Sequence, residues 1–232
     1  MRPHHLTVRK TARYFLSDWT GEPAVSSLWI VLHGYRQSAE RFASRFEGLR
    51  RPDRLVVAPE GLSRFYVDED GGPHGVEHRV GASWMTRVDR EAEIADYVAY
   101  LDQLRASLLE RYQVRGPRII VLGFSQGSHT AARWALRGAL APDELVLWGA
   151  GLHADLDEAL EGKRLRDLSV TIVRGRSDPL APERLLRRER ERMEALGVAA
   201  RILEYDGGHE IEAGALQALA GMVDPVTGTR ES

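Results

Sequence analysis

Hydrophobic residues occur in short continuous runs, and most of the stretches between these runs have helical spacing. The runs that predict strands are residues 28–34, 55–61, 118–125, 144–151, 170–175 and 200–208. Their apolar residues are consecutive rather than alternating, which is typical of strands buried on both faces of a sheet. Strands that alternate with helices favour β-α-β units around a mostly parallel sheet. We expect residues 6–10 and 12–18 to add edge strands.

Three stretches between the runs predict helices. Residues 90–112 carry an apolar stripe at steps of three and four, formed by Ile94, Val98, Leu101, Leu104 and Leu108. Residues 182–196 begin with Pro182, a residue favoured at the first helical position. That helix is expected to turn its apolar residues inward, namely Leu185, Leu186, Met193 and Leu196. An Ala-rich stretch at 128–136 predicts a third helix.

Residues 62–86 form the longest stretch without a clear periodic pattern. The segment contains several Gly residues and a Pro, and loops of this length in compact domains are often functional. Short strands at 64–68 and 79–84 are the alternative interpretation.

Only about twenty residues separate the runs at 144–151 and 170–175, too few for an inserted cap domain. We therefore predict an α/β fold with helices on both faces of the sheet, without a large cap, as a single domain over residues 1–232.

Composition narrows the classes of partner and chemistry. A net charge of −2 and a pI near 6.5 argue against nucleic acid as a partner. The first ten residues lack the apolar core of a signal peptide, and no run is long enough to span a bilayer. We expect a cytoplasmic protein that does not insert stably into a membrane. The oligomeric state stays open, and a homo-oligomer is one of the alternatives. The absence of Cys excludes disulfides, thiolate metal sites and a Cys nucleophile.

The motif GFSQG at residues 123–127 follows a predicted strand and precedes the Ala-rich helix. A Ser at such a strand-to-helix turn is held in a strained conformation that exposes its hydroxyl, and the flanking Gly residues let the backbone pass without collision. Ser125 is therefore the candidate nucleophile. A Gly-flanked turn serine without catalytic function is the alternative.

A serine nucleophile needs an imidazole base, and the base needs a carboxylate to fix its tautomer. Asp178 follows one predicted strand and His209 follows the last one. Both lie where loops converge at the carboxyl ends of parallel strands. Asp206 is the alternative acid. His129 lies one helical turn beyond Ser125 and is expected to pack or form local hydrogen bonds.

Hydrolysis also needs hydrogen-bond donors for the oxyanion of the tetrahedral intermediate. One donor is normally the backbone N–H after the nucleophile, here Gln126, and the other comes from the loop after an earlier strand, here the N–H of Tyr35. His33 and Gly34 are expected to shape that loop. Arg36, Arg87 and Arg176 are candidates to meet a phosphate or carboxylate on a substrate, although most arginines are expected to be surface charges.

These motifs resemble those of the phospholipase/carboxylesterase family of α/β-hydrolases, which includes acyl-protein thioesterases and many bacterial serine esterases. The segment LHGYRQSAERF resembles the oxyanion loop of the family, GFSQG the nucleophile elbow, GRSDPLAP the acid turn and GGHEI the histidine loop. The resemblance implies an α/β-hydrolase fold, a Ser125–Asp178–His209 triad, no cofactor, and hydrolysis of an ester or thioester of a small molecule or an acylated substrate. This sequence differs from the family pattern at Tyr35 and Arg36, where many members carry Gly-Asp. It also differs after Trp84, where the usual Phe-Asp is missing.

Three aromatic residues of the 62–86 segment are candidates for an acyl pocket: Phe65, Tyr66 and Trp84. The alternative is that they pack the segment against the core. A different chemistry is suggested by HGVEH, in which His74 and His78 match the H-x-x-E-H pattern of zinc peptidases. That pattern requires a helix, and the Gly and Pro residues around it argue against one. A ligand-binding protein without catalysis is the remaining alternative, because fold does not fix function.

Overall fold

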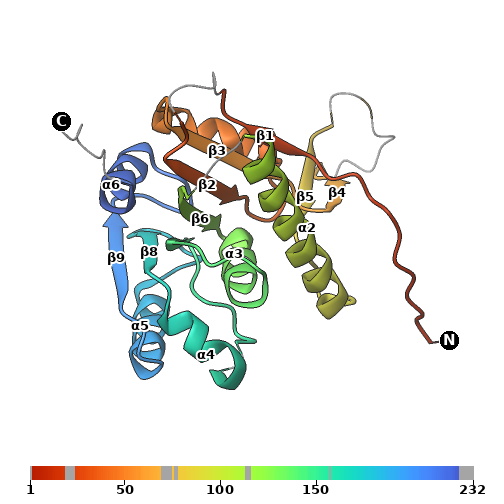
Figure 1. The fold of residues 1–232 in the computed structure, drawn as a ribbon. Coiled ribbons are helices and arrows are strands. Elements are labelled where there is room, and N and C mark those ends of the chain that lie inside the picture. Colours follow the sequence, from red (N-terminus) through yellow and green to blue (C-terminus); the bar gives the residue numbers. More distant parts are fainter. Residues whose placement is uncertain are drawn as a thin grey trace.

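The computed structural model describes residues 2–18, 24–68, 75, 78–112, 116–156 and 158–224. Within these residues seven strands form one sheet in the order β1-β3-β2-β6-β7-β8-β9 (Figure 1). Their bounds are Tyr14–Leu16 (β1), Ser27–Leu32 (β2), Arg54–Pro59 (β3), Arg118–Phe124 (β6), Glu144–Trp148 (β7), Val170–Gly175 (β8) and Ala200–Tyr205 (β9). β1 pairs antiparallel with β3, and the remaining neighbours pair in parallel. The predicted mostly parallel sheet is confirmed.

Helices cover both faces of this sheet. One face carries α2 (Arg90–Arg111), α3 (Gln126–Arg137), α4 (Glu158–Arg166) and α5 (Glu183–Ala195). The other carries α1 (Ala39–Ala43), the 3-10 helix η1 (Ser44–Leu49) and α6 (Ala213–Val223). Side chains of a strand alternate between faces, so Leu28 and Ile30 of β2 contact the first group, whereas Trp29 and Val31 contact the second. This is the predicted α/β-hydrolase architecture, and α4 is the helix between β7 and β8, where no large cap is inserted.

Some local predictions were wrong. Residues 6–10 form no strand, and Leu6 and Val8 are exposed. Leu185, expected to point inward on α5, is 44% exposed, because the inward face is filled by Leu186 and Met193. Pro182 is the N-cap of α5 rather than its first helical residue.

The segment 62–86 contains a two-stranded antiparallel hairpin, β4 (Ser63–Tyr66) and β5 (Val80–Ser83), so the strand alternative is confirmed for its described residues. The hairpin is joined to the rest of the protein by an isolated bridge between Gln37 and Ala82. It therefore lies beside the loop that follows β2.

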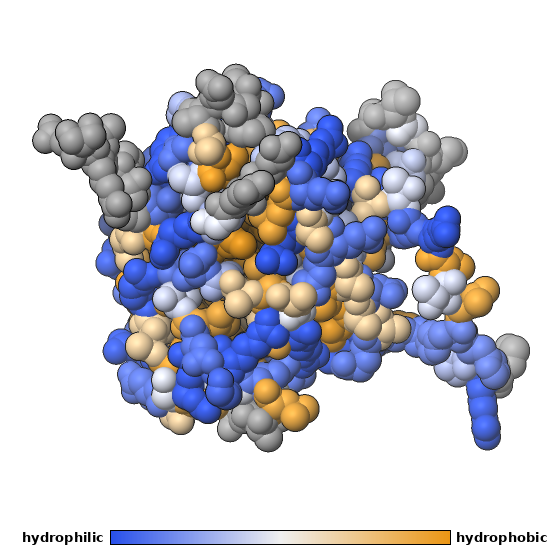
Figure 2. Space-filling model, viewed as in Figure 1, coloured by the Kyte–Doolittle hydropathy of each residue, from blue (hydrophilic) through white to orange (hydrophobic). Residues whose placement is uncertain are grey.

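The surface is mostly polar on the face shown in Figure 2, where hydrophilic residues are interspersed with smaller hydrophobic groups. No helix of the described chain has the length and apolarity to cross a membrane.

Candidate active site

Ser125 lies in a sharp turn between β6 and α3. Its φ of 55° and ψ of −117° are unusual for a residue with a side chain, and such strain is typical of functional turns. Its backbone N–H donates to the carbonyl of Trp148 at 2.8 Å, which anchors the turn to the end of β7. The geometry is that of a nucleophile elbow, which presents a hydroxyl at the carboxyl edge of the sheet.

The two Gly residues of the GFSQG motif are required by close backbone approach. A Cβ on Gly123 would come within 2.1 Å of the Gly127 carbonyl oxygen, and a Cβ on Gly127 within 2.1 Å of the Leu32 carbonyl oxygen. These separations are far below any van der Waals contact. The steric role predicted for both glycines is confirmed.

His209 and Asp178 meet at the same edge of the sheet. The imidazole Nδ1 lies 2.7 Å from Asp178 Oδ2, and the other carboxylate oxygen accepts the backbone N–H groups of Leu180 (2.8 Å) and Ala181 (3.2 Å). The Asp178 side chain is only 1% exposed, whereas that of His209 is 20% exposed. A carboxylate held in this way keeps the proton of the imidazole on Nδ1 and leaves Nε2 as an accessible base.

Close packing places the His209 ring beside the elbow. The ring contacts the ring of Phe124, the residue before Ser125, with 4.8 Å between centroids and a tilt of 38°. It also lies close to Gly149, with a φ of 70°, where a Cβ would come within 2.9 Å of His209 Cε1. The sequence did not single out Gly149, which lies inside the predicted run 144–151; in the structure it directly follows β7.

The hydroxyl of Ser125 makes no hydrogen bond within the described residues, to His209 or to any other group. In enzymes without substrate the bond between nucleophile and base is often long and tightens when the complex forms. The arrangement is therefore compatible with a serine whose proton is taken only when substrate is bound.

Two backbone N–H groups border the elbow without a partner in the described part of the chain. They belong to Tyr35 and Gln126, the two donors expected from the sequence. Gln126 is the first residue of α3, where an N–H has no partner within the helix. Gly34 brings the two segments together, since a Cβ there would lie 3.3 Å from Ser125 Cβ.

His33 anchors the loop after β2 through two hydrogen bonds formed by its ring. It is fully buried, its Nε2 accepts the N–H of Gly61 at 3.0 Å, and its Nδ1 lies 2.8 Å from the Gly34 carbonyl. These contacts require a proton on Nδ1 and none on Nε2, so the ring is neutral. Burial lowers the pKa of His33, which keeps it in this form.

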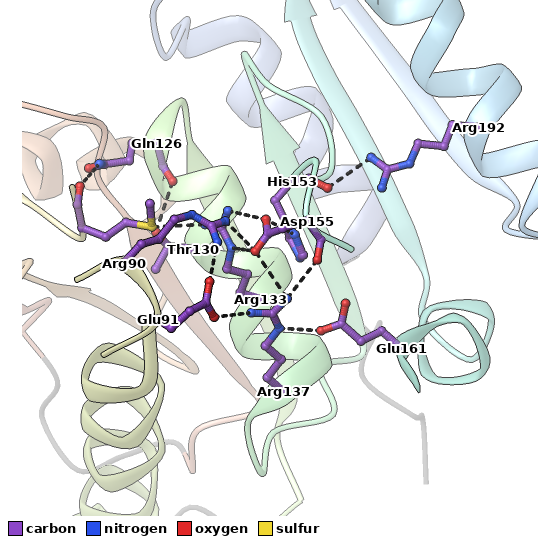
Figure 3. A network of polar contacts seen from close by, with 11 residues as sticks. Arg90, Glu91, Gln126, Thr130, Arg133, Arg137, His153, Asp155, Glu161 and Arg192 are labelled. Carbon is purple, nitrogen blue, oxygen red and sulfur yellow. Dashed lines mark hydrogen bonds and ion pairs between the residues drawn. The ribbon is translucent and has the colours of Figure 1, made fainter. Parts of the chain in front are cut away.

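The Gln126 side chain joins the elbow to the end of β5. Its amide donates to the Met85 carbonyl at 2.9 Å and accepts the Trp84 N–H at 3.2 Å. Figure 3 shows Gln126 next to a network of Arg and acidic side chains around Asp155, to which Arg133 of α3 donates a hydrogen bond of 2.7 Å. The network fixes the far side of α3 to the segment after β7.

The predicted pocket aromatics have different environments. Trp84 is 2% exposed and donates from its indole to the His33 carbonyl at 2.8 Å, so it packs the segment against the core, which was the alternative for this residue. Phe65 is half-buried against the Tyr35 ring at 5.7 Å, and Tyr66 is exposed. None of the three lines either cavity described below.

The residues considered as alternatives for the acid, the base and a metal site lie in environments that differ from those of Asp178 and His209. The Asp206 side chain is 90% exposed and pairs with Arg176, not with His209. Burial, assisted by Arg133, lowers the pKa of His129 to about 4. For the zinc pattern, His74 lies outside the described residues, and the described residues Gly75 and His78 are not helical, so the helix that the pattern requires is missing there.

Two cavities lie near these residues. One, of about 380 Å³, is lined by His209 and Phe124 and bordered by the loop after Tyr35. The other, of about 560 Å³, lies between α5 and the end of β8 and contains none of Ser125, Asp178 and His209 in its lining. Of Ser125, Asp178 and His209, only His209 lines the smaller cavity.

The sequence model of the serine hydrolase family FSH1 matches residues 28–215. This chain belongs to that family. The prediction of an esterase-type serine hydrolase is thereby confirmed at the level of the family, and the matched region contains every residue of the site described above. A search of curated protein sequences found no match.

Solved structures with the same fold include esterases and an acyl-protein thioesterase. Esterase PE8 is 22% identical, with a TM-score of 0.65, and the match covers 92% of this chain and 98% of that one. A carboxylesterase from Mesorhizobium loti is 15% identical, with a TM-score of 0.69 and coverage of 91% and 93%. Acyl-protein thioesterase 2 from Zea mays is 14% identical, with a TM-score of 0.67 and coverage of 91% and 97%.

Proposed function

We propose that this serine hydrolase, as one domain spanning residues 1–232, cleaves carboxylic esters or thioesters through an acyl-enzyme. The observation that carries the proposal is the 2.7 Å contact between His209 Nδ1 and Asp178 Oδ2, on the same edge of the sheet as the strained turn of Ser125. The N–H groups of Tyr35 and Gln126, which have no partner among the described residues, add the donors that an oxyanion requires.

In the proposed reaction the Ser125 hydroxyl attacks the acyl carbonyl while His209 Nε2 takes its proton. The carbonyl oxygen becomes an oxyanion that accepts hydrogen bonds from the N–H groups of Tyr35 and Gln126. When the intermediate collapses, His209 returns the proton to the oxygen or sulfur of the leaving group, and Ser125 keeps the acyl group as an ester. Water, deprotonated by His209, then releases the acid and restores the serine.

Asp178 acts through His209 in this scheme. It accepts the Nδ1–H, holds the ring in the tautomer with a free Nε2, and stabilises the imidazolium that forms during attack. Its two backbone hydrogen bonds keep the carboxylate from rotating. Proton transfer therefore takes place at Nε2 alone.

Hydrolysis of a p-nitrophenyl ester series from acetate to octanoate tests the proposal, with wild type and Ser125→Ala assayed in parallel and EDTA present. We expect turnover that EDTA does not alter and that falls by at least about 10³-fold in Ser125→Ala. Activity that survives in Ser125→Ala, or that EDTA abolishes, contradicts the proposal. The preferred chain length reports the size of the acyl site.

A further inference from the structure

We propose that the cavity beside His209 binds an anionic group, a carboxylate or phosphate, on the leaving group of the substrate. This inference rests on the proposed function and names the substrate class of the same site. The cavity has a volume of about 380 Å³, within the range of small-molecule sites. Its apolar wall includes Phe42 and Phe124, and its charged rim consists of four arginines: Arg36, Arg41, Arg45 and Arg79.

The arginines at the rim exceed the acids near them. Glu210 also lines the cavity, and Asp68 pairs with Arg79 at 2.9 Å. Among the described residues, four positive charges set against these two negative charges leave an excess of two. A concave site with such an excess attracts anions and repels cations.

Two of the four guanidinium groups are available to a ligand. Arg41 and Arg45 make no hydrogen bond or ion pair through their side chains in the described part of the chain. They stand four residues apart on the continuous helical segment of α1 and η1, so both point to the same side. Arg79 is already bound to Asp68, and Arg36 donates to the Val67 carbonyl.

The backbone at Arg36 ties this cavity to the oxyanion loop. Arg36 has a φ of 66°, a left-handed conformation that costs about 1 kcal/mol for a residue with a side chain. Its N–H donates to the Ala82 carbonyl at 3.0 Å, which fixes the turn in a position where the N–H of Tyr35 has no partner among the described residues. Backbone strain of this kind is concentrated at functional sites.

The chemistry of the proposed reaction decides which half of the substrate lies here. His209 must return its proton to the leaving oxygen or sulfur, so that atom must be within hydrogen-bond reach of the imidazole. Since His209 lines the cavity, the remainder of the leaving group extends into it, toward Arg41 and Arg45. The structure thus favours esters or thioesters of an anionic alcohol or thiol.

Four phenolic esters test this assignment. Meta-acetoxybenzoate and meta-acetoxyphenyl phosphate carry the anion on the leaving group, as a carboxylate and a phosphate respectively. Methyl meta-acetoxybenzoate is the neutral match of the first. The hemisuccinate of methyl meta-hydroxybenzoate carries its carboxylate on the acyl group instead. Release of each phenol is measured at low ionic strength as kcat/KM.

The variant is Arg41→Gln/Arg45→Gln, and the matched control is Arg184→Gln/Arg187→Gln on the exposed side of α5. Both remove two positive charges from exposed helical positions, but the control residues line neither cavity. We expect the ratio of kcat/KM for anionic over neutral leaving groups to fall about tenfold in the first variant, as for two exposed ion pairs. The ratio stays at the wild-type value in the control, and added salt reduces it in wild type.

Three results overturn the inference, and they differ from one another. An unchanged ratio in Arg41→Gln/Arg45→Gln, while hydrolysis of the neutral ester still requires Ser125, removes the anion site and leaves the serine mechanism standing. A selective loss of the hemisuccinate reaction places the anion on the acyl side. Hydrolysis of the neutral ester by Ser125→Ala shows instead that the proposed function itself is wrong.

Discussion

Two His–Asp pairs in this protein have the same hydrogen-bond length and opposite surroundings. His209 Nδ1 lies 2.7 Å from Asp178, and His153 Nδ1 lies 2.7 Å from Asp155. The His209 side chain is 20% exposed and lines a cavity, whereas that of His153 is 1% exposed. In the described part of the chain, Nε2 of His153 is buried without a hydrogen-bond partner. A His–Asp pair can serve as a base only when its second nitrogen is accessible to a substrate.

The carboxylates differ as well. Asp178 is oriented by two backbone N–H groups, which leaves His209 as its only side-chain partner among the described residues. Asp155 is surrounded by Arg90, Arg133 and Arg137, so most of its charge is balanced by guanidinium groups (Figure 3). The first pair has the arrangement that the proposed proton transfer requires, and the second fixes α2 and α3 to the segment after β7.

The largest effect is expected from Asp178→Asn. Asparagine cannot hold the Nδ1–H tautomer in the same way, so the imidazole presents the wrong nitrogen to Ser125, and kcat falls by about 10⁴-fold. The measurement is turnover of p-nitrophenyl acetate together with circular dichroism to verify folding. A folded variant that keeps more than a tenth of wild-type kcat contradicts the assignment of the acid.

Gly149→Ala tests the packing that positions His209. The new Cβ would come within 2.9 Å of the imidazole, and the displaced ring lowers kcat by about 10²-fold. Gly197→Ala is the matched control, since Gly197 has a φ of 71° close to the 70° of Gly149, but its Cβ would approach only Arg166. Equal losses of activity in the two variants show that backbone strain, not displacement of His209, is responsible.

His153→Gln changes the buried pair and is expected to alter kcat less than about threefold, because His153 forms no hydrogen bond or ion pair with Ser125, Asp178 or His209 among the described residues. Its effect is on stability. Burial, assisted by Arg133, lowers the pKa of His153 to about 4 from 6.5. Below pH 6.5 the unfolded chain takes up this proton and the folded protein does not, so wild type loses up to about 3 kcal/mol of unfolding free energy as the pH falls to 4.

Urea denaturation of wild type and His153→Gln between pH 7 and pH 4 measures this contribution. The charges that face the imidazole, from Asp155, Arg133 and Arg137, are present in both proteins. The wild type should therefore show the steeper decline of unfolding free energy with acid. Parallel pH profiles for the two proteins disprove the link to His153.

The smallest effect is expected from Asp206→Asn. This carboxylate is exposed and pairs with Arg176 at 2.8 Å, and exposed ion pairs contribute little. Turnover should change by less than about twofold, and a large loss would make Asp206 the acid in place of Asp178.

Most of the fold and the triad candidates could be predicted from the sequence. The continuous apolar runs give the parallel strands, and GFSQG, Asp178 and His209 each follow a strand, so topology brings them to one edge. The pattern could not predict that Leu185 is exposed, because helical spacing does not say how wide a groove the neighbouring sheet leaves. It also could not place Trp84, since an aromatic residue suits a pocket and a core equally.

The sequence did not single out the features that depend on three-dimensional proximity. Gly149 resembles any other residue after a strand until His209 is packed against it. Arg41 and Arg45 are two of many arginines, and only the cavity beside His209 distinguishes them. Arg36 was a candidate for an anionic group and does line this cavity, whereas Arg176 pairs with Asp206.

The central claim is that Ser125 carries the acyl group. Rapid mixing of wild type with p-nitrophenyl acetate at high enzyme concentration, followed by acid quench and mass spectrometry of the peptides, tests it most directly. We predict a burst of about one p-nitrophenol per enzyme and an acetyl group on the peptide that contains Ser125, both absent in Ser125→Ala. Linear release without a burst and no acetylated peptide, or acetylation at another residue, would contradict the account.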